Sequence, residues 1–225
     1  MKTVAYLTIG QTPRADVCDE LRQLLPESVC LREYGVLDGL TAQEAKALFG
    51  YRGEGELLVS RLGTGELVEL SGEAVFHGLQ TCIDRAEAQG ADVLLVGCTG
   101  IFPVYRHRAP LLFPGALQRK ATLERAKGIS IGVLAPLREQ LAEIAGWWRA
   151  DGAPEVMLEA ADPFGDVGDM AAAALRLRQR GAGILCMDCF GYSRQARDAA
   201  EKACGLEIVL PREILAQEAL RALAD

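Results

Sequence analysis

Residues 90–100 read GADVLLVGCTG, and residues 181–191 read GAGILCMDCFG. The two segments are identical at five of eleven positions, including the first and last glycines and one cysteine. Each holds a nearly continuous apolar run, which is typical of a β-strand covered on both faces in a parallel sheet. We predict two related halves in which Cys98 and Cys189 occupy equivalent positions. Chance similarity between buried strands is the alternative, since all such runs are apolar.

Strand-like and helix-like segments alternate along most of the chain. This alternation predicts an α/β fold with two pseudo-symmetric lobes, each a mostly parallel sheet flanked by helices. We place the first lobe at residues 1–127, with a hairpin at about 57–70, and the second at 128–225. The C-terminal helix is free to pack back on the first lobe. An inter-lobe cleft is expected at the carboxyl ends of the strands.

Local signals predict where several helices begin. Thr12 and Pro13 suit the N-cap and the first position of a helix that reaches about Leu25. The stretch from Thr41 to Glu44 has the pattern of a capping box before a short helix. Parallel strands are expected at 4–8, 29–36, 92–98, 129–134, 156–160, 184–189 and 206–210, with helices between them.

The composition excludes several classes of protein. Hydrophobic residues make up 50% of the 225 positions, which is too apolar for disorder. Lys and Arg total 24 against 31 Asp and Glu, so the net charge is −7, which argues against broad nucleic-acid binding. No apolar run approaches the roughly 20 residues of a membrane span. The first residues have no signal-peptide pattern, so we expect a cytoplasmic protein.

Seven cysteines stand beside only two histidines. In a reducing compartment each cysteine is either a small core residue or a working thiol. Four cysteines lie within helix or strand patterns and are expected to be core or surface residues without a chemical role: Cys18, Cys30, Cys82 and Cys204. Cys186 and Cys189 form a Cys-x-x-Cys pair, which leaves redox or zinc chemistry open. Without a second pair or a nearby histidine, we predict no metal and no cofactor.

Cys98 and Cys189 are the candidate catalytic residues. A cysteine after a strand and before a helix N-terminus has its pKa lowered from about 8.5. Two such thiols could face one small molecule from opposite sides. One thiolate would remove a proton from an acidified carbon while the other thiol supplies a proton. The alternative is that both are buried thiols at strand ends.

Residues around these turns are candidates for holding a small anionic metabolite. Amide groups, hydroxyls and a guanidinium at a strand-to-helix turn can bind a carboxylate or phosphate. Simple N-capping with a solvated arginine explains the first turn equally well. The candidate substrate-binding residues are Gly10, Gln11, Thr12, Arg14, Thr99, Gly100, Gly191 and Tyr192.

Four motifs carry a family resemblance: LTIG at 7–10, GADVLL at 90–95, VLAP at 133–136 and MDCFG at 187–191. On these motifs the chain resembles the AroM family. More distantly it resembles the aspartate/glutamate racemase superfamily, which includes hydantoin racemases and maleate isomerases. Those proteins have two similar lobes with one cysteine from each, often in Cys-Asn-Thr and Gly-Cys-Thr motifs. Cys98 and Cys189 match these two positions.

The resemblance implies a cofactor-independent racemase, epimerase or isomerase. Such a protein would act by two-cysteine proton transfer on a small carboxylate, amino acid or hydantoin. The racemases' Asp-Ser-Gly motif is replaced here by residues 8–14, and Phe190 follows the second cysteine. These departures favour one alternative, a non-catalytic binding or sensor protein. A single-cysteine lyase or decarboxylase is another. A homodimer is the base-rate expectation for the assembly.

Overall fold

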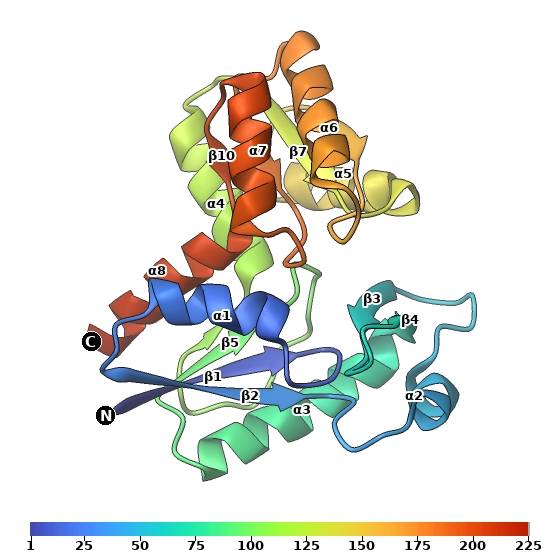
Figure 1. Cartoon of the computed structure of the whole chain (residues 1–225), viewed down its shortest axis with the longest axis vertical. Coiled ribbons are helices and arrows are strands. Elements are labelled where there is room, and N and C mark those ends of the chain that lie inside the picture. The colour runs from blue at the N-terminus through green and yellow to red at the C-terminus, as the bar shows by residue number, and fades with distance from the viewer. Residues whose placement is uncertain (225) are drawn as a thin grey trace. The chain divides into compact units, whose positions relative to one another are not determined.

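Two four-stranded parallel sheets form the framework of the chain, as the computed structural model shows for residues 1–224 (Figure 1). The chain divides into two units. The first joins Met1–Phe113 with the end of the chain from Ala216, and the second is Pro114–Leu215. The predicted α/β class, with helices flanking parallel sheets, is confirmed. Within residues 1–224, no helix is long and apolar enough to cross a membrane.

The sheet of the first unit has the strand order β2-β1-β5-β6. Figure 1 shows α1 and α3 on opposite sides of this sheet. Ala5 and Leu7 alternate along β1 and share one core cluster with Leu79 and Ile83 of α3. The elements are β1 (Lys2–Thr8), α1 (Ala15–Leu24), β2 (Val29–Gly35), α3 (Gly72–Ala88), β5 (Val93–Val96) and β6 (Leu111–Leu112).

An insertion between β2 and α3 follows its local sequence signals. Thr41 accepts a hydrogen bond from the Glu44 amide, and the Glu44 carboxylate accepts one from the Thr41 amide, so the predicted capping box is confirmed. It begins α2 (Ala42–Phe49). The predicted hairpin is also confirmed, with β3 (Leu57–Arg61) antiparallel to β4 (Leu67–Ser71).

The sheet of the second unit has the order β10-β9-β7-β8 and is covered on both faces. On one face, Leu134 packs with residues of α6 and α7. On the other, Val133 and Ala135 pack with residues of α4 and α5. The elements are α4 (Pro114–Ala126), β7 (Ile131–Ala135), a 3-10 turn (Arg138–Gln140), α5 (Leu141–Ala150), β8 (Met157–Ala160), α6 (Val167–Gln179), β9 (Ile184–Met187), α7 (Arg194–Cys204) and β10 (Ile208–Val209). Helix α8 (Pro211–Ala224) begins in this unit, and its residues from Ala216 are grouped with the first.

The two sheets have the same topology. Counted along the chain within each four-stranded sheet, the strand order is second, first, third, fourth. β5 and β9 are therefore equivalent third strands, and the two segments that repeat in the sequence contain them. The structure thus gives the sequence repeat a topological basis.

The unit boundary falls one helix earlier than residue 127. Helix α4 is grouped with the second unit, whereas the predicted boundary places all of it in the first. Its side chains explain this grouping, because Gln118 donates a hydrogen bond to Asp188 at 2.5 Å and Ala126 packs in the same core cluster as Trp148.

The predicted start of α1 is wrong. The helix begins at Ala15, with Arg14 as its N-cap residue. Thr12 does not cap it, because the Thr12 amide and hydroxyl both donate to Asp38 Oδ1, at 2.8 Å and 3.0 Å. Asp38 lies in the turn after β2 and also accepts from the Gly35 amide. A carboxylate distant in sequence therefore displaces a local capping interaction.

Replacing Tyr192 with Phe should lower the stability of the second unit. The side chain is fully buried, and its hydroxyl lies 2.9 Å from the carbonyl oxygen of Ala135 and 2.6 Å from that of Ala161. Loss of the hydroxyl leaves buried carbonyls without this donor, so we expect the free energy of unfolding to fall by about 1–3 kcal/mol. Urea unfolding followed by circular dichroism measures this change.

The matched control is Tyr51→Phe, because the Tyr51 hydroxyl lies at the surface of the first unit. We expect that change to stay within about 0.5 kcal/mol. Equal unfolding curves for Tyr192→Phe and the parent protein would contradict the structural role given to this hydroxyl.

Candidate active site

Each cysteine lies at the topological switch point of its own sheet. In both units the first and third strands are neighbours in the centre, and the second and fourth strands lie at opposite edges. Open parallel sheets bind ligands outside the carboxyl ends of the strands at such a point. Cys98 follows the end of β5 by two residues, and Cys189 follows the end of β9 by two residues. The fold therefore brings both thiols to positions suited to ligand binding.

The same backbone hydrogen bond precedes each cysteine. The Gly97 amide donates to the Leu7 carbonyl at 2.8 Å, and the Asp188 amide donates to the Leu134 carbonyl at 2.8 Å. Leu7 and Leu134 lie at matching places near the ends of the first strands. This bond extends the pairing of the central strands by one residue. Each cysteine is consequently the first residue beyond the paired strand.

Cys189 lies in surroundings that favour a thiolate. The Gly191 amide donates to the Cys189 sulfur at 3.4 Å. Ser193 follows as the N-cap of α7, and its hydroxyl accepts from the Ala196 amide at 3.1 Å. Amide donors and a helix N-terminus both stabilise negative charge on sulfur. Arg212, which is buried, holds this turn by donating to the carbonyl oxygens of Phe190 at 2.9 Å and Gly191 at 3.0 Å.

Cys98 lies in different surroundings. The segment after it has no helix and runs as a loop to β6. Gly100 is close to both the thiol and a carboxylate, since a Cβ at this position would lie 3.6 Å from Cys98 Sγ and 3.1 Å from Glu56 Oε1. Tyr105 also lies nearby. Its pKa is raised by burial and further by Cys98 and Glu56, so its hydroxyl stays protonated.

Asp188 faces the opposite side of the sheet from its neighbour Cys189. Residues alternate along a strand, so Cys186 and Asp188 share one face while Cys189 points to the other. The Asp188 carboxylate is buried and accepts from Gln118 Nε2 at 2.5 Å and Trp148 Nε1 at 3.0 Å. Burial, and next the charge of Asp188, raise the pKa of Cys186 well above its usual value. The Cys-x-x-Cys spacing therefore separates the two sulfurs.

All seven cysteines are free thiols. Burial raises the pKa of Cys82 to about 12, and burial followed by Glu33 raises the pKa of Cys18. Both side chains lie in the core. Across residues 1–224, no group of three His, Cys, Asp or Glu side chains is arranged to hold a metal ion.

The turn after β1 is held by bonds within the first unit. Gln11 donates from Nε2 to the carbonyl oxygens of Leu37 and Leu40 at 3.0 Å and 2.6 Å. Its Oε1 accepts from the Gly63 amide at 2.7 Å. Gly10 has no room for a side chain, because a Cβ would collide with the Ser60 hydroxyl oxygen. Gln11 therefore connects its own turn to the loop after β2 and to the turn between β3 and β4. That Gln11 contacts a substrate stays a prediction.

Arg14 is buried, and all three of its guanidinium nitrogens have partners. Nε and one terminal nitrogen donate to Asp16 at 2.9 Å and 2.8 Å, and the other terminal nitrogen donates to the Thr8 hydroxyl at 3.2 Å. Burial acts to lower the pKa of Arg14, but the hydrogen bond with Asp16 and the nearby charges together outweigh it, so the pKa is raised. The arginine thus adds a permanent positive charge to this turn.

The predicted site residues fall into two groups. Gly100 lies beside Cys98, and Gly191 beside Cys189, while Thr99 is buried next to the first cysteine. The polar side chains of Gln11, Thr12, Arg14 and Tyr192 instead bond within their own units. Sequence reasoning missed Glu56 and Arg212, because no local motif marks them.

Comparison with known proteins gives a family and a fold. A family described as AroM protein matches residues 4–221. No curated protein sequence matches the chain. Among solved structures, maleate isomerase from Pseudomonas putida is similar at 12% identity and TM-score 0.65, covering 99% of this chain and 94% of that one.

Two further structures share the fold. Glutamate racemase from Bacillus anthracis matches at 15% identity and TM-score 0.62, covering 99% of this chain and 82% of the other. Arylmalonate decarboxylase matches at 14% identity and TM-score 0.62, covering 98% of this chain and 92% of the other. At such identities the likeness is one of fold. Because the family match extends over nearly the whole chain, this protein belongs to the AroM family.

Proposed function

We propose that this protein is a cofactor-independent racemase, epimerase or isomerase that acts on a small anionic metabolite through Cys98 and Cys189. One observation carries the proposal. Two sheets of identical strand order each place a cysteine two residues beyond the third strand, after the same backbone hydrogen bond. Racemases and isomerases among the proteins of similar fold support this class of reaction.

The two thiols have different electrostatic surroundings, which gives them different roles. The Gly191 amide and the N-terminus of α7 favour the thiolate at Cys189. The Glu56 carboxylate near Gly100 favours the protonated form of Cys98. We assign Cys189 as the resting base and Cys98 as the resting acid.

The reaction follows from these roles. The Cys189 thiolate takes a proton from the carbon next to the substrate's activating group, and the electron pair moves into that group. The Cys98 thiol then delivers its own proton to the opposite face of the same carbon. The carbon is inverted, and the two cysteines have exchanged protonation states. The reverse reaction starts from that exchanged state, so no cofactor is consumed.

A second candidate is a lyase or decarboxylase that uses one cysteine. The unequal surroundings of the two thiols favour it, since α7 begins at Arg194, shortly after Cys189, whereas a loop follows Cys98. A decarboxylase also shares the fold. In that reaction one thiol protonates the carbanion that remains after carbon dioxide leaves, and the other cysteine has no chemical step.

Thiol labelling should separate the seven cysteines by reactivity. Alkylation requires the thiolate, so Cys82, with its pKa raised to about 12, and Cys186, with its pKa raised well above the usual value, should react very slowly near neutral pH. We expect iodoacetamide to modify Cys189 first, as measured by peptide mass spectrometry. The partly exposed Cys30 provides the reference rate. Labelling of Cys189 no faster than of Cys30 would favour a non-catalytic binding protein.

Isotope exchange tests the chemistry directly. The protein is incubated in heavy water with candidate amino acids, hydantoins and 2-substituted carboxylic acids, and loss of the α-proton signal is followed by NMR. We expect Cys98→Ala and Cys189→Ala each to slow interconversion of the two stereoisomers by at least about 100-fold. Cys30→Ala, a cysteine of β2, should leave the rate unchanged.

The pattern of losses distinguishes the candidates. If both variants interconvert the stereoisomers as fast as the parent protein, the two-thiol mechanism is wrong. If only one cysteine is needed, the single-cysteine reaction replaces it. Circular dichroism of each variant shows that the fold is retained.

A further inference from the structure

A cavity in the first unit lies beside the loop that carries Cys98. Its volume is about 920 Å³, within the range of small-molecule sites. Its walls come from the segment before β3, the end of β4, α3 from Glu73 to Asp84, and the loop after Cys98. The lining includes Glu54, Glu73, Phe76, Asp84, Tyr105 and Arg106.

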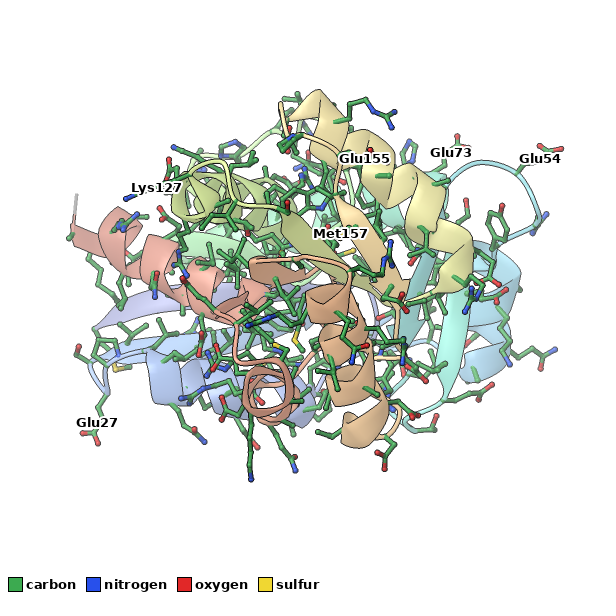
Figure 2. All side chains as sticks on the ribbon, turned by 90° about the horizontal axis from the view of Figure 1, so that it is seen from above. Glu27, Glu54, Glu73, Lys127, Glu155 and Met157 are labelled. Carbon is green, nitrogen blue, oxygen red and sulfur yellow. The ribbon has the colours of Figure 1, made fainter. Side chains whose placement is uncertain are left out.

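The charge of this cavity is negative. Glu54, Glu73 and Asp84 form no ion pair within residues 1–224, and the Asp84 carboxylate accepts only the neutral Gln80 amide at 2.9 Å. Arg106 is the one arginine or lysine in the lining. Figure 2 shows the Glu54 and Glu73 side chains projecting on the same side of the ribbon. A cationic ligand would therefore be attracted here, and an anionic one repelled.

Tyr105 supplies an independent sign of a missing partner. The residue is 8% exposed and lines the cavity, and its buried hydroxyl has no hydrogen-bond partner among the residues that the structure describes. A buried hydroxyl without a partner is costly and rare. Its oxygen can accept a hydrogen bond from an N–H group of a bound molecule.

Phe76 and Tyr105 are the aromatic residues of the lining, and ring contacts through Phe102 and Phe113 connect them. Phe76 packs edge-on to Phe102, with ring centroids 5.4 Å apart. Phe102 stacks on Phe113 at 5.3 Å, and Phe113 on Tyr105 at 6.2 Å. The two lining rings offer a surface to hydrocarbon or aryl groups, and ring faces attract cations. The cavity thus combines carboxylates with an aromatic wall.

These features favour an organic cation over a metal ion. In the described part of the chain, the carboxylates of this cavity do not form a metal-binding group of three. Charges spread around a large cavity suit a ligand that extends from one wall to another. We propose that the cavity binds an organic ammonium compound with an aryl or alkyl body. Its ammonium group would lie near Tyr105 and the carboxylates, and its body against the Phe76 ring.

The cavity adjoins the proposed reaction centre, because Glu56 and Tyr105 line it and also lie near Cys98. The proposal does not depend on the proposed reaction. Cys98 is absent from the cavity lining, and the proposed substrate is an anion. An amine that binds here would contact Tyr105 and Arg106, which belong to the same loop as Cys98.

Calorimetry with 2-phenylethylamine on the full chain tests the proposal. Phenylacetate and 2-phenylethanol serve as anionic and neutral probes of matched shape. We expect saturable binding of the amine only. Tyr105→Phe and Glu73→Gln should each raise the dissociation constant of the amine by about five- to tenfold, since each removes one polar contact to a charged group. Both changes keep the size of the side chain, and circular dichroism verifies folding.

Glu27→Gln is the matched control, because Glu27 is exposed and Figure 2 shows it far from Glu54 and Glu73. It should leave amine binding unchanged. Absence of saturable binding up to about 10 mM amine would overturn the proposal. So would equal binding of phenylacetate, or unchanged affinity in both cavity variants. Displacement of the amine by calcium at constant ionic strength would also overturn it, in favour of a metal site.

Discussion

A single backbone hydrogen bond in each unit determines where its cysteine lies. Parallel pairing aligns the central first and third strands, and the Gly97 and Asp188 amides extend that pairing by one residue, to Leu7 and Leu134. Beyond this bond the chain leaves the sheet at its carboxyl edge. Side chains in these turns are therefore free to differ, because the backbone pairing holds the cysteine in place.

The residue before the cysteine differs between the two units. In the first unit the residue before the cysteine is Gly97, where a Cβ would collide with the Tyr6 ring. In the second it is Asp188, whose buried carboxylate bonds with Trp148 and Gln118. A shared topology thus supports unequal electrostatics: an amide donor and a helix N-terminus at one thiol, and a carboxylate at the other.

Local patterns predicted most of the helices and strands, because they depend on interactions within a few residues. The capping box at Thr41 is one example, and the hairpin at 57–71 is another. The start of α1 was predicted wrongly, because Thr12 bonds to Asp38, which is 26 residues further along the chain. Long-range hydrogen bonds of this kind leave no periodic trace in a sequence. For the same reason the sequence did not predict the role of Arg212. This residue of α8 donates hydrogen bonds to backbone carbonyls in the turn after Cys189.

The amino-acid sequence by itself determined the α/β class, the repeat, and the two cysteines at corresponding places. These depend on apolar periodicity and on identical residues, which are visible without coordinates. Only the tertiary structure decided which polar groups surround each thiol. It showed that Gln11 and Tyr192 bond within their own units, and it revealed the cavity lined by Tyr105. The physical reason is that hydrogen-bond partners and cavities are made by segments far apart in the chain, which only folding brings together.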